Sequence, residues 1–169
     1  MPDLPCSEGQ VVVAAPDQGI DFGGVTSCMT VTLLLSDGTK IAGHNGVDLF
    51  VRPDLVYLLG AKLREQTTGT ARTLSSVRAI GSGGTWTPGL ASSDSVIKSL
   101  IKSGALTADS NYAEINSALT PRMCNFGDNG DRLVASLAGA FRVQVGLVSF
   151  TDYDEGRIQI MVDGSPQLG

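Results

Sequence analysis

The stretch from Gly24 to Gly46, GVTSCMTVTLLLSDGTKIAGHNG, constrains the fold more than any other part of the chain. It contains a run of β-branched and aliphatic residues from Met29 to Leu35, and a second, shorter run follows a Ser-Asp-Gly-Thr segment. An Asp-Gly pair between two such runs predicts a β-hairpin, because its turn needs positive φ angles that Asn, Asp and Gly tolerate. The chain is therefore expected to fold back on itself at Asp37-Gly38.

Two chemically reactive residues flank this hairpin. Cys28 precedes the turn by about ten residues, and His44, the only histidine of the chain, follows it by about six. Both are expected near the open end of the hairpin, where side chains at opposite positions have Cβ atoms roughly 4.5 to 5.5 Å apart. A thiol–imidazole pair is therefore a candidate site.

Such a pair has a defined chemistry. A thiol is a nucleophile as its thiolate, which an adjacent imidazolium stabilises, and the same imidazole can give its proton to a departing amine. Backbone N–H groups around Ser27 and Cys28 are candidates for holding an oxyanion. The alternative on these residues alone is a buried structural cysteine beside an unrelated surface histidine, since free cysteine is among the most buried residue types.

Composition narrows the class of protein. The 169 residues suit a single domain, 1–169, and three cysteines argue against a disulfide framework. The formal net charge of −5 weighs against a nucleic-acid partner, because binding to phosphates requires clustered Lys and Arg. The start, MPDLPCSEG, resembles no secretory signal, and no apolar run approaches the roughly 20 residues of a membrane span. One histidine and scattered cysteines predict no zinc site, and we expect a soluble protein without cofactors or metal.

The other periodic segments predict an α/β fold. Apolar runs predict strands at residues 10–15, 73–80, 142–150 and 157–162, and apolar stripes with capping residues predict helices opening at 52–54, over 94–102 and over 130–140. In the first helix the stripe consists of Leu55, Leu58, Leu59 and Leu63. Residues 1–9 read as a loose lead-in in which Cys6 is incidental, and residues 17–24 read as turns. These elements predict a layered α/β sandwich with a mixed, largely antiparallel sheet and helices packed on it.

The hairpin residues resemble a known family. Gly24-Val-Thr-Ser-Cys28-Met-Thr-Val, an Asp-containing turn and Lys40-Ile-Ala-Gly-His44 are similar to the signature of the CheD family of chemoreceptor glutamine deamidases. Cytotoxic necrotizing factor and related deamidating toxins share this Cys–His layout. Later segments follow the family's order: a helix after the hairpin, a strand running into residues 81–84, and Asn125 to Asn129 before a late helix.

The resemblance implies a reaction and a set of residues. Cys28 would attack a glutamine carboxamide of a protein substrate, His44 would protonate the departing ammonia, and water would resolve the thioester. The family's orienting threonine is replaced by Phe22, so the candidates for orienting the histidine or holding an oxyanion are Asp21, Thr26 and Ser27. The candidate loop facing the substrate contains Gly83, Gly84 and Trp86.

The chain also departs from the family. Residues 85–122 resemble an insertion, and the family's glycine- and arginine-rich segment is missing from residues 151–157. These departures favour a divergent deamidase, either cytoplasmic or an effector delivered into a target cell by a signal-independent secretion system. A cysteine peptidase or transglutaminase would use the same pair. A non-catalytic interaction domain on the same fold, with Trp86 in its contact surface, is the remaining alternative.

Overall fold

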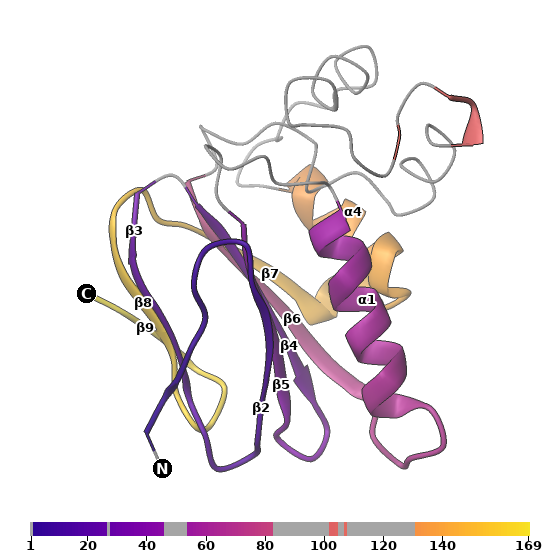
Figure 1. Cartoon of the computed structure of the whole chain (residues 1–169), viewed down its shortest axis with the longest axis horizontal. Helices are drawn as coiled ribbons and strands as arrows, with labels where there is room; N and C mark the ends of the chain where they lie inside the picture. Colours follow the sequence, from indigo (N-terminus) through magenta and orange to yellow (C-terminus); the bar gives the residue numbers. More distant parts are fainter. Residues whose placement is uncertain (1, 27, 46–53, 83–101, 105–106, 108–130) are drawn as a thin grey trace.

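The computed structural model describes residues 2–26, 28–45, 54–82, 102–104, 107 and 131–169. Within these residues the fold has three layers: a four-stranded sheet, a five-stranded sheet, and two helices on the outer face of the larger sheet (Figure 1). The strands are β1 (Leu4–Pro5), β2 (Val11–Ala14), β3 (Ile20–Val25), β4 (Met29–Leu35), β5 (Lys40–Asn45), β6 (Leu74–Gly81), β7 (Val148–Asp152), β8 (Gly156–Ile160) and β9 (Pro166–Leu168). The helices are α1 (Asp54–Thr67) and α4 (Asp131–Phe141), with a short 3-10 turn, η3 (Val145–Leu147), before β7.

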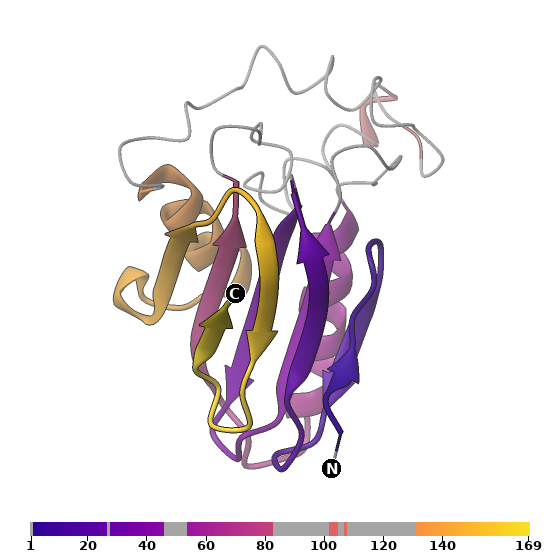
Figure 2. The same cartoon turned by 90° about the vertical axis from the view of Figure 1, so that its left-hand side faces the viewer.

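The predicted α/β sandwich is confirmed, but it contains two mixed sheets rather than one. The five-stranded sheet has the order β2-β5-β4-β6-β7 and the four-stranded sheet β1-β3-β8-β9. Each has one parallel pair, β6 with β7 and β1 with β3, among antiparallel ones. Figure 2 shows the smaller sheet lying in front of the larger one, near both ends of the chain.

The alternation of side chains along β4 divides the core in two. Met29, Val31, Leu33 and Leu35 face the helices, where they pack with residues of α1, α4, β6 and β7. Cys28, directly before β4, belongs to the other cluster, which contains residues of β3 and β8. This division follows from the two-residue period of a strand, which turns successive side chains to opposite faces. The same alternation determines which side chains lie in the layer between the two sheets.

The predicted hairpin is confirmed as β4 and β5, with a different turn. Leu34 pairs with Lys40, and the amide of Leu35 donates to the carbonyl of Thr39 at 2.9 Å. Only Gly38 has a positive φ, 91°, so the loop is a turn closed by one left-handed glycine rather than a two-residue turn with two positive φ angles. The Asp37 carboxylate accepts a hydrogen bond from the Thr39 amide at 2.9 Å.

The two helices begin close to where the sequence predicts them. In α4 the predicted apolar face is confirmed, with Leu133, Leu137 and Ala138 buried and Val134 partly buried. In α1, Leu59 is buried and Leu63 packs on the core, but Leu58 is 43% exposed, so Leu58 does not belong to the predicted apolar stripe. All but the last residue of the helix predicted over 94–102, and most of the proposed insertion, lie outside the described residues.

One other prediction was wrong, and the bounds of two predicted strands differ from those observed. Residues 20–25 form β3 and not a series of turns, because pairing with β8 orders them despite two glycines and a register shift after Asp21. The strand predicted over 142–150 begins only at Val148, after η3. The strand predicted over 157–162 ends at Ile160. None of the described helices is both long and apolar enough to span a bilayer.

Candidate functional site

Cys28 directly precedes β4 and His44 lies near the end of β5, so both are at the open end of the β4–β5 hairpin, where Phe22 contacts His44 and shares a core cluster with Cys28. His44 pairs with Thr30, and Cys28 comes directly before Met29, the first paired residue of β4, so the cysteine is not the direct cross-strand partner of the histidine. Both are buried between the two sheets, with Cys28 8% and His44 4% exposed.

The imidazole of His44 is held in one tautomer. Its Nδ1 lies 2.8 Å from the backbone carbonyl oxygen of Cys6. Because a carbonyl oxygen only accepts hydrogen bonds, Nδ1 carries a proton, and Nε2 is the basic nitrogen of the neutral ring. Nε2 is buried and has no hydrogen-bond partner among the described residues.

Phe22 fixes the plane of this ring. Its own ring meets the imidazole edge to face, with centroids 5.7 Å apart and an interplanar angle of 85°. Phe22 makes this contact from β3, across the layer between the two sheets. The imidazole is thus oriented by one backbone carbonyl and one aromatic ring.

The Cys28 thiol contacts a carboxylate. Its Sγ donates to Oε1 of Glu8 at 3.2 Å, across twenty residues of sequence. The Glu8 residue itself is exposed, whereas Cys28 is buried, so the carboxylate lies on the solvent side of the thiol. This contact was not predicted from the sequence.

The segment from Cys6 to Gln10 supplies both the carbonyl that contacts His44 and the carboxylate that contacts Cys28. The prediction that residues 1–9 are a loose lead-in was therefore wrong. The amide of Gly9 donates to the His44 carbonyl at 2.6 Å, and the amide of His44 donates to the Gln10 carbonyl at 3.1 Å. Gly9 has a φ of 83°, a conformation that suits glycine. This segment is therefore tied to the backbone of His44 on both sides, and it places Glu8 over Cys28.

Cys6 has a structural role and is not the incidental residue that the sequence had indicated. Its side chain is 1% exposed, and burial raises the pKa of its thiol to about 12. A thiol with so high a pKa is a poor nucleophile near neutral pH. Its backbone carbonyl is the group that serves the site.

The end of β6 packs tightly against Cys28. A Cβ added to Gly81 would lie 2.9 Å from the Met29 Cα and closer still to the Cys28 carbonyl oxygen. Next to it, the buried Ser82 donates its hydroxyl to the Asp154 carboxylate at 3.1 Å. Strands β4 and β6 therefore meet at the cysteine with no room for a side chain between them.

The other predicted site residues do not join this group. The Asp21 carboxylate accepts hydrogen bonds from Arg157 and from the Gly23 amide, and the Arg157 guanidinium holds its pKa below the usual range. Because Nδ1 of His44 is bound by Cys6 and Nε2 has no partner among the described residues, neither Asp21 nor the exposed Thr26 orients the imidazole through a hydrogen bond. Ser27, Gly83, Gly84 and Trp86 lie outside the described residues.

Sequence reasoning missed Glu8 and the carbonyl of Cys6. No local pattern marks either, because a backbone carbonyl has no sequence signature and a single exposed glutamate is common on protein surfaces.

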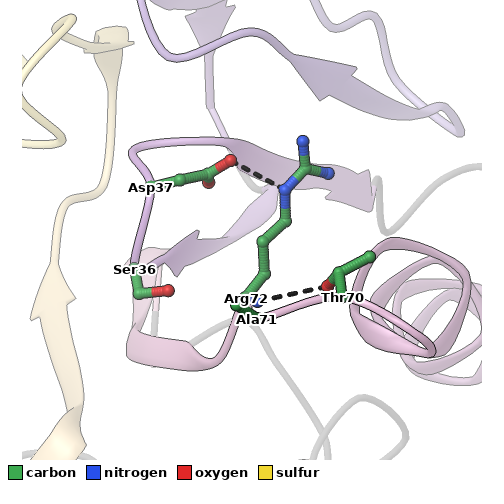
Figure 3. Close-up of a pocket in the computed structure, with 5 residues that line it drawn as sticks. All are labelled: Ser36, Asp37, Thr70, Ala71 and Arg72. Atoms are coloured by element: carbon green, nitrogen blue, oxygen red, sulfur yellow. Dashed lines mark hydrogen bonds and ion pairs between the residues drawn. The ribbon is translucent and has the colours of Figure 1, made fainter.

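A hollow of about 440 Å³ lies at the opposite end of the hairpin, between Ser36, Asp37, Thr70, Ala71 and Arg72 (Figure 3). The Arg72 guanidinium is already occupied, by the Asp37 carboxylate at 2.7 Å and by the Gln66 side chain at 2.8 Å. The hollow is therefore not a second candidate site. Within the described part of the chain, no three His, Cys, Asp or Glu side chains are grouped as metal ligands would be.

A scan of the chain against protein-family models found no match, and a search of curated proteins found no significant one. The geometry of the site therefore carries the functional argument.

Proposed function

We propose that this chain is a cysteine-dependent protein-glutamine deamidase on a CheD-like scaffold, with Cys28 as nucleophile and His44 as general base and acid. The observation that carries the proposal is the state of the imidazole: Nδ1 is fixed by the Cys6 carbonyl, and Nε2 is buried without a partner among the described residues, at the same open end of the hairpin as the thiol. A buried polar atom without a partner costs free energy, and a catalytic role is one of the explanations of such an atom.

The proposed reaction begins when Cys28 turns from Glu8 toward Nε2. Nε2 takes the thiol proton, and the thiolate attacks the side-chain carbonyl carbon of a glutamine. An S–C bond forms, and the backbone N–H of Cys28 is a candidate donor to the developing oxyanion. His44 returns the proton to the amide nitrogen, the C–N bond breaks, and ammonia leaves.

Water completes the cycle. Nε2 takes a proton from the water that attacks the thioester, the C–S bond breaks, and Nε2 gives this proton to the departing sulfur, so that glutamate is released and the Cys28 thiol is restored. If an amine attacked instead, the enzyme would be a transglutaminase, and if a peptide carbonyl were attacked first, it would be a peptidase. No cofactor is needed for any of these three outcomes.

The first test requires no substrate. The rate of Cys28 alkylation by iodoacetamide is measured against pH in the wild type and in His44→Ala. We expect half-maximal alkylation in the wild type well below the unperturbed thiol pKa of about 8.5, and a return toward that value without His44. Peptide mapping distinguishes Cys28 from Cys6, whose raised pKa keeps it unreactive over the same range. The same profile in both proteins would refute the pair.

The second test measures the reaction. Glutamine-containing peptides are incubated with the wild type and Cys28→Ala, and released ammonia and the Gln-to-Glu mass change are recorded together. We expect both signals with the wild type and neither with Cys28→Ala. A new amine cross-link or a cut backbone would instead identify a transglutaminase or a peptidase.

One observation favours a second candidate, a non-catalytic interaction domain. Cys28 is only 8% exposed and its thiol already donates a hydrogen bond to Glu8, as a structural cysteine would. An interaction domain would be indifferent to Cys28→Ala in every binding assay, and its thiol would titrate normally with or without His44.

A further inference from the structure

Glu8 places an exposed carboxylate against the buried thiol of Cys28. Its Oε1 lies 3.2 Å from Sγ of Cys28, and the cysteine is buried while the glutamate is exposed. The next two residues of the chain hold the Glu8 segment in place. The Gly9 amide donates a hydrogen bond to the His44 carbonyl, and the His44 amide donates one to the Gln10 carbonyl. A group bonded to the sulfur therefore lies within a few ångströms of the Glu8 carboxylate.

A carboxylate at this position distinguishes the substrate from the product. An ionised carboxylate only accepts hydrogen bonds, and the side-chain amide of glutamine offers two N–H donors. Glutamate offers no donor and carries the same negative charge. Two like charges a few ångströms apart repel each other, and the repulsion grows where protein excludes water.

We propose that Glu8 is the specificity-determining residue of this site, which admits a neutral carboxamide to Cys28 and rejects a carboxylate. The inference rests on the proposed function. In the reaction, Glu8 accepts a hydrogen bond from the amide nitrogen while the S–C bond forms, and it neither gains nor loses a proton. After the C–N bond breaks and water has cleaved the thioester, its charge repels the new glutamate carboxylate.

The experiment uses two alkylating reagents that differ in this one feature. Iodoacetamide carries a neutral carboxamide and iodoacetate carries a carboxylate of similar size. The two rates are measured at Cys28 by peptide mapping at one fixed pH near neutrality. Their ratio is divided by the ratio for glutathione under the same conditions. Both reagents consume the same thiolate, so the ratio is independent of how much thiolate is present.

In the wild type we expect the corrected ratio to favour iodoacetamide by about fivefold or more, an effect that added salt weakens. In Glu8→Gln, which keeps the size of the side chain and loses its charge, the preference is expected to disappear. Glu8→Asp keeps the charge and should retain most of it. Glu65→Gln is the matched control, because it removes one negative charge from an exposed position on α1 and should leave the ratio unchanged.

The proposal is overturned if Glu8→Gln has the same corrected ratio as the wild type, or if the wild type shows no preference. This result is separable from the fate of the deamidase proposal, which depends on ammonia release and on His44. A protein that releases no ammonia but loses its reagent preference in Glu8→Gln would refute the deamidase and keep Glu8 as the selective group of the site.

Discussion

At the scale of single residues, Lys40 shows how burial between the sheets changes the pKa of a charged side chain. It lies on the same face of β5 as His44, its side chain is fully buried, and its Nζ donates to the carbonyls of Gly38 at 3.0 Å and Pro16 at 3.4 Å. Burial lowers the pKa of Lys40 below its ordinary 10.5, and the charges of three aspartates, at positions 163, 17 and 37, only partly offset this effect. The folded protein therefore binds this proton less tightly than the unfolded chain does.

The sign of the pH dependence follows. Between the lowered pKa and 10.5 the unfolded chain binds more protons, so Lys40 makes the free energy of unfolding rise with pH across that window. Below the window both states are protonated, and the cost of burying the ammonium is constant. Replacing it with an apolar residue of similar length removes this cost, although it also removes two hydrogen bonds.

We therefore expect Lys40→Met to be as stable as the wild type at neutral pH, within about 1 kcal/mol, or more stable. Relative to the wild type, the variant should lose stability as the pH approaches 10.5. Urea unfolding at a series of pH values measures both quantities. Lys62→Met, which removes a surface lysine paired with Glu65, is the control for the loss of one positive charge. A stability difference that does not vary with pH would contradict the prediction.

At the scale of elements, the contact between β4 and β6 decides where Cys28 stands. Gly81 pairs with Met29, and a Cβ there would meet backbone atoms of both Met29 and Cys28, which cannot move as a flexible side chain can. A methyl group at this position must push the two strands apart. The displacement would be felt at the cysteine first.

We expect Gly81→Ala to lower the free energy of unfolding by about 1 to 3 kcal/mol and to change the alkylation rate of Cys28. Gly24→Ala, in β3, is the control, because a Cβ there has no atom within 4 Å and should leave both quantities nearly unchanged. Denaturant unfolding and iodoacetamide kinetics measure them. Equal stability of the two variants would show that the strands are not in close contact at this point.

The elements also show what the sequence can predict. The β4–β5 hairpin was predictable because its signal is local: two apolar runs, and a glycine that takes the one positive φ. Strand β1 was not, since two residues carry no periodicity and are ordered only by parallel pairing with β3 sixteen residues later. The site divides in the same way: Cys28 and His44 follow from the hairpin, whereas the Glu8 and Cys6 contacts come from a segment that folds over it from outside.

At the scale of the whole molecule, one sheet supports two cores. The five-stranded sheet packs its helix-facing side chains with α1 and α4, and its opposite face packs with the four-stranded sheet. Strands β5 and β6 contribute to both clusters, so neither half keeps its packing if the central sheet is lost. Cooperative unfolding of small domains arises from shared packing of this kind. The described layers should therefore unfold together, and the site, which is built from both sheets, should be lost in the same transition.

Two core truncations test this. Leu33 and Ile158 are both fully buried, the first in the core under the helices and the second between the sheets. We expect Leu33→Ala and Ile158→Ala each to lower the free energy of unfolding by about 2 to 5 kcal/mol in a single transition that is the same by circular dichroism and by exposure of Cys28 to alkylation. Val162→Ala, at a position 48% exposed, is the control and should change stability by less than about 0.5 kcal/mol. If Ile158→Ala instead exposed Cys28 at a denaturant concentration where the helical signal persisted, the four-stranded sheet would be a separate unit. The site would then open by local unfolding of that sheet, without loss of the helical layer.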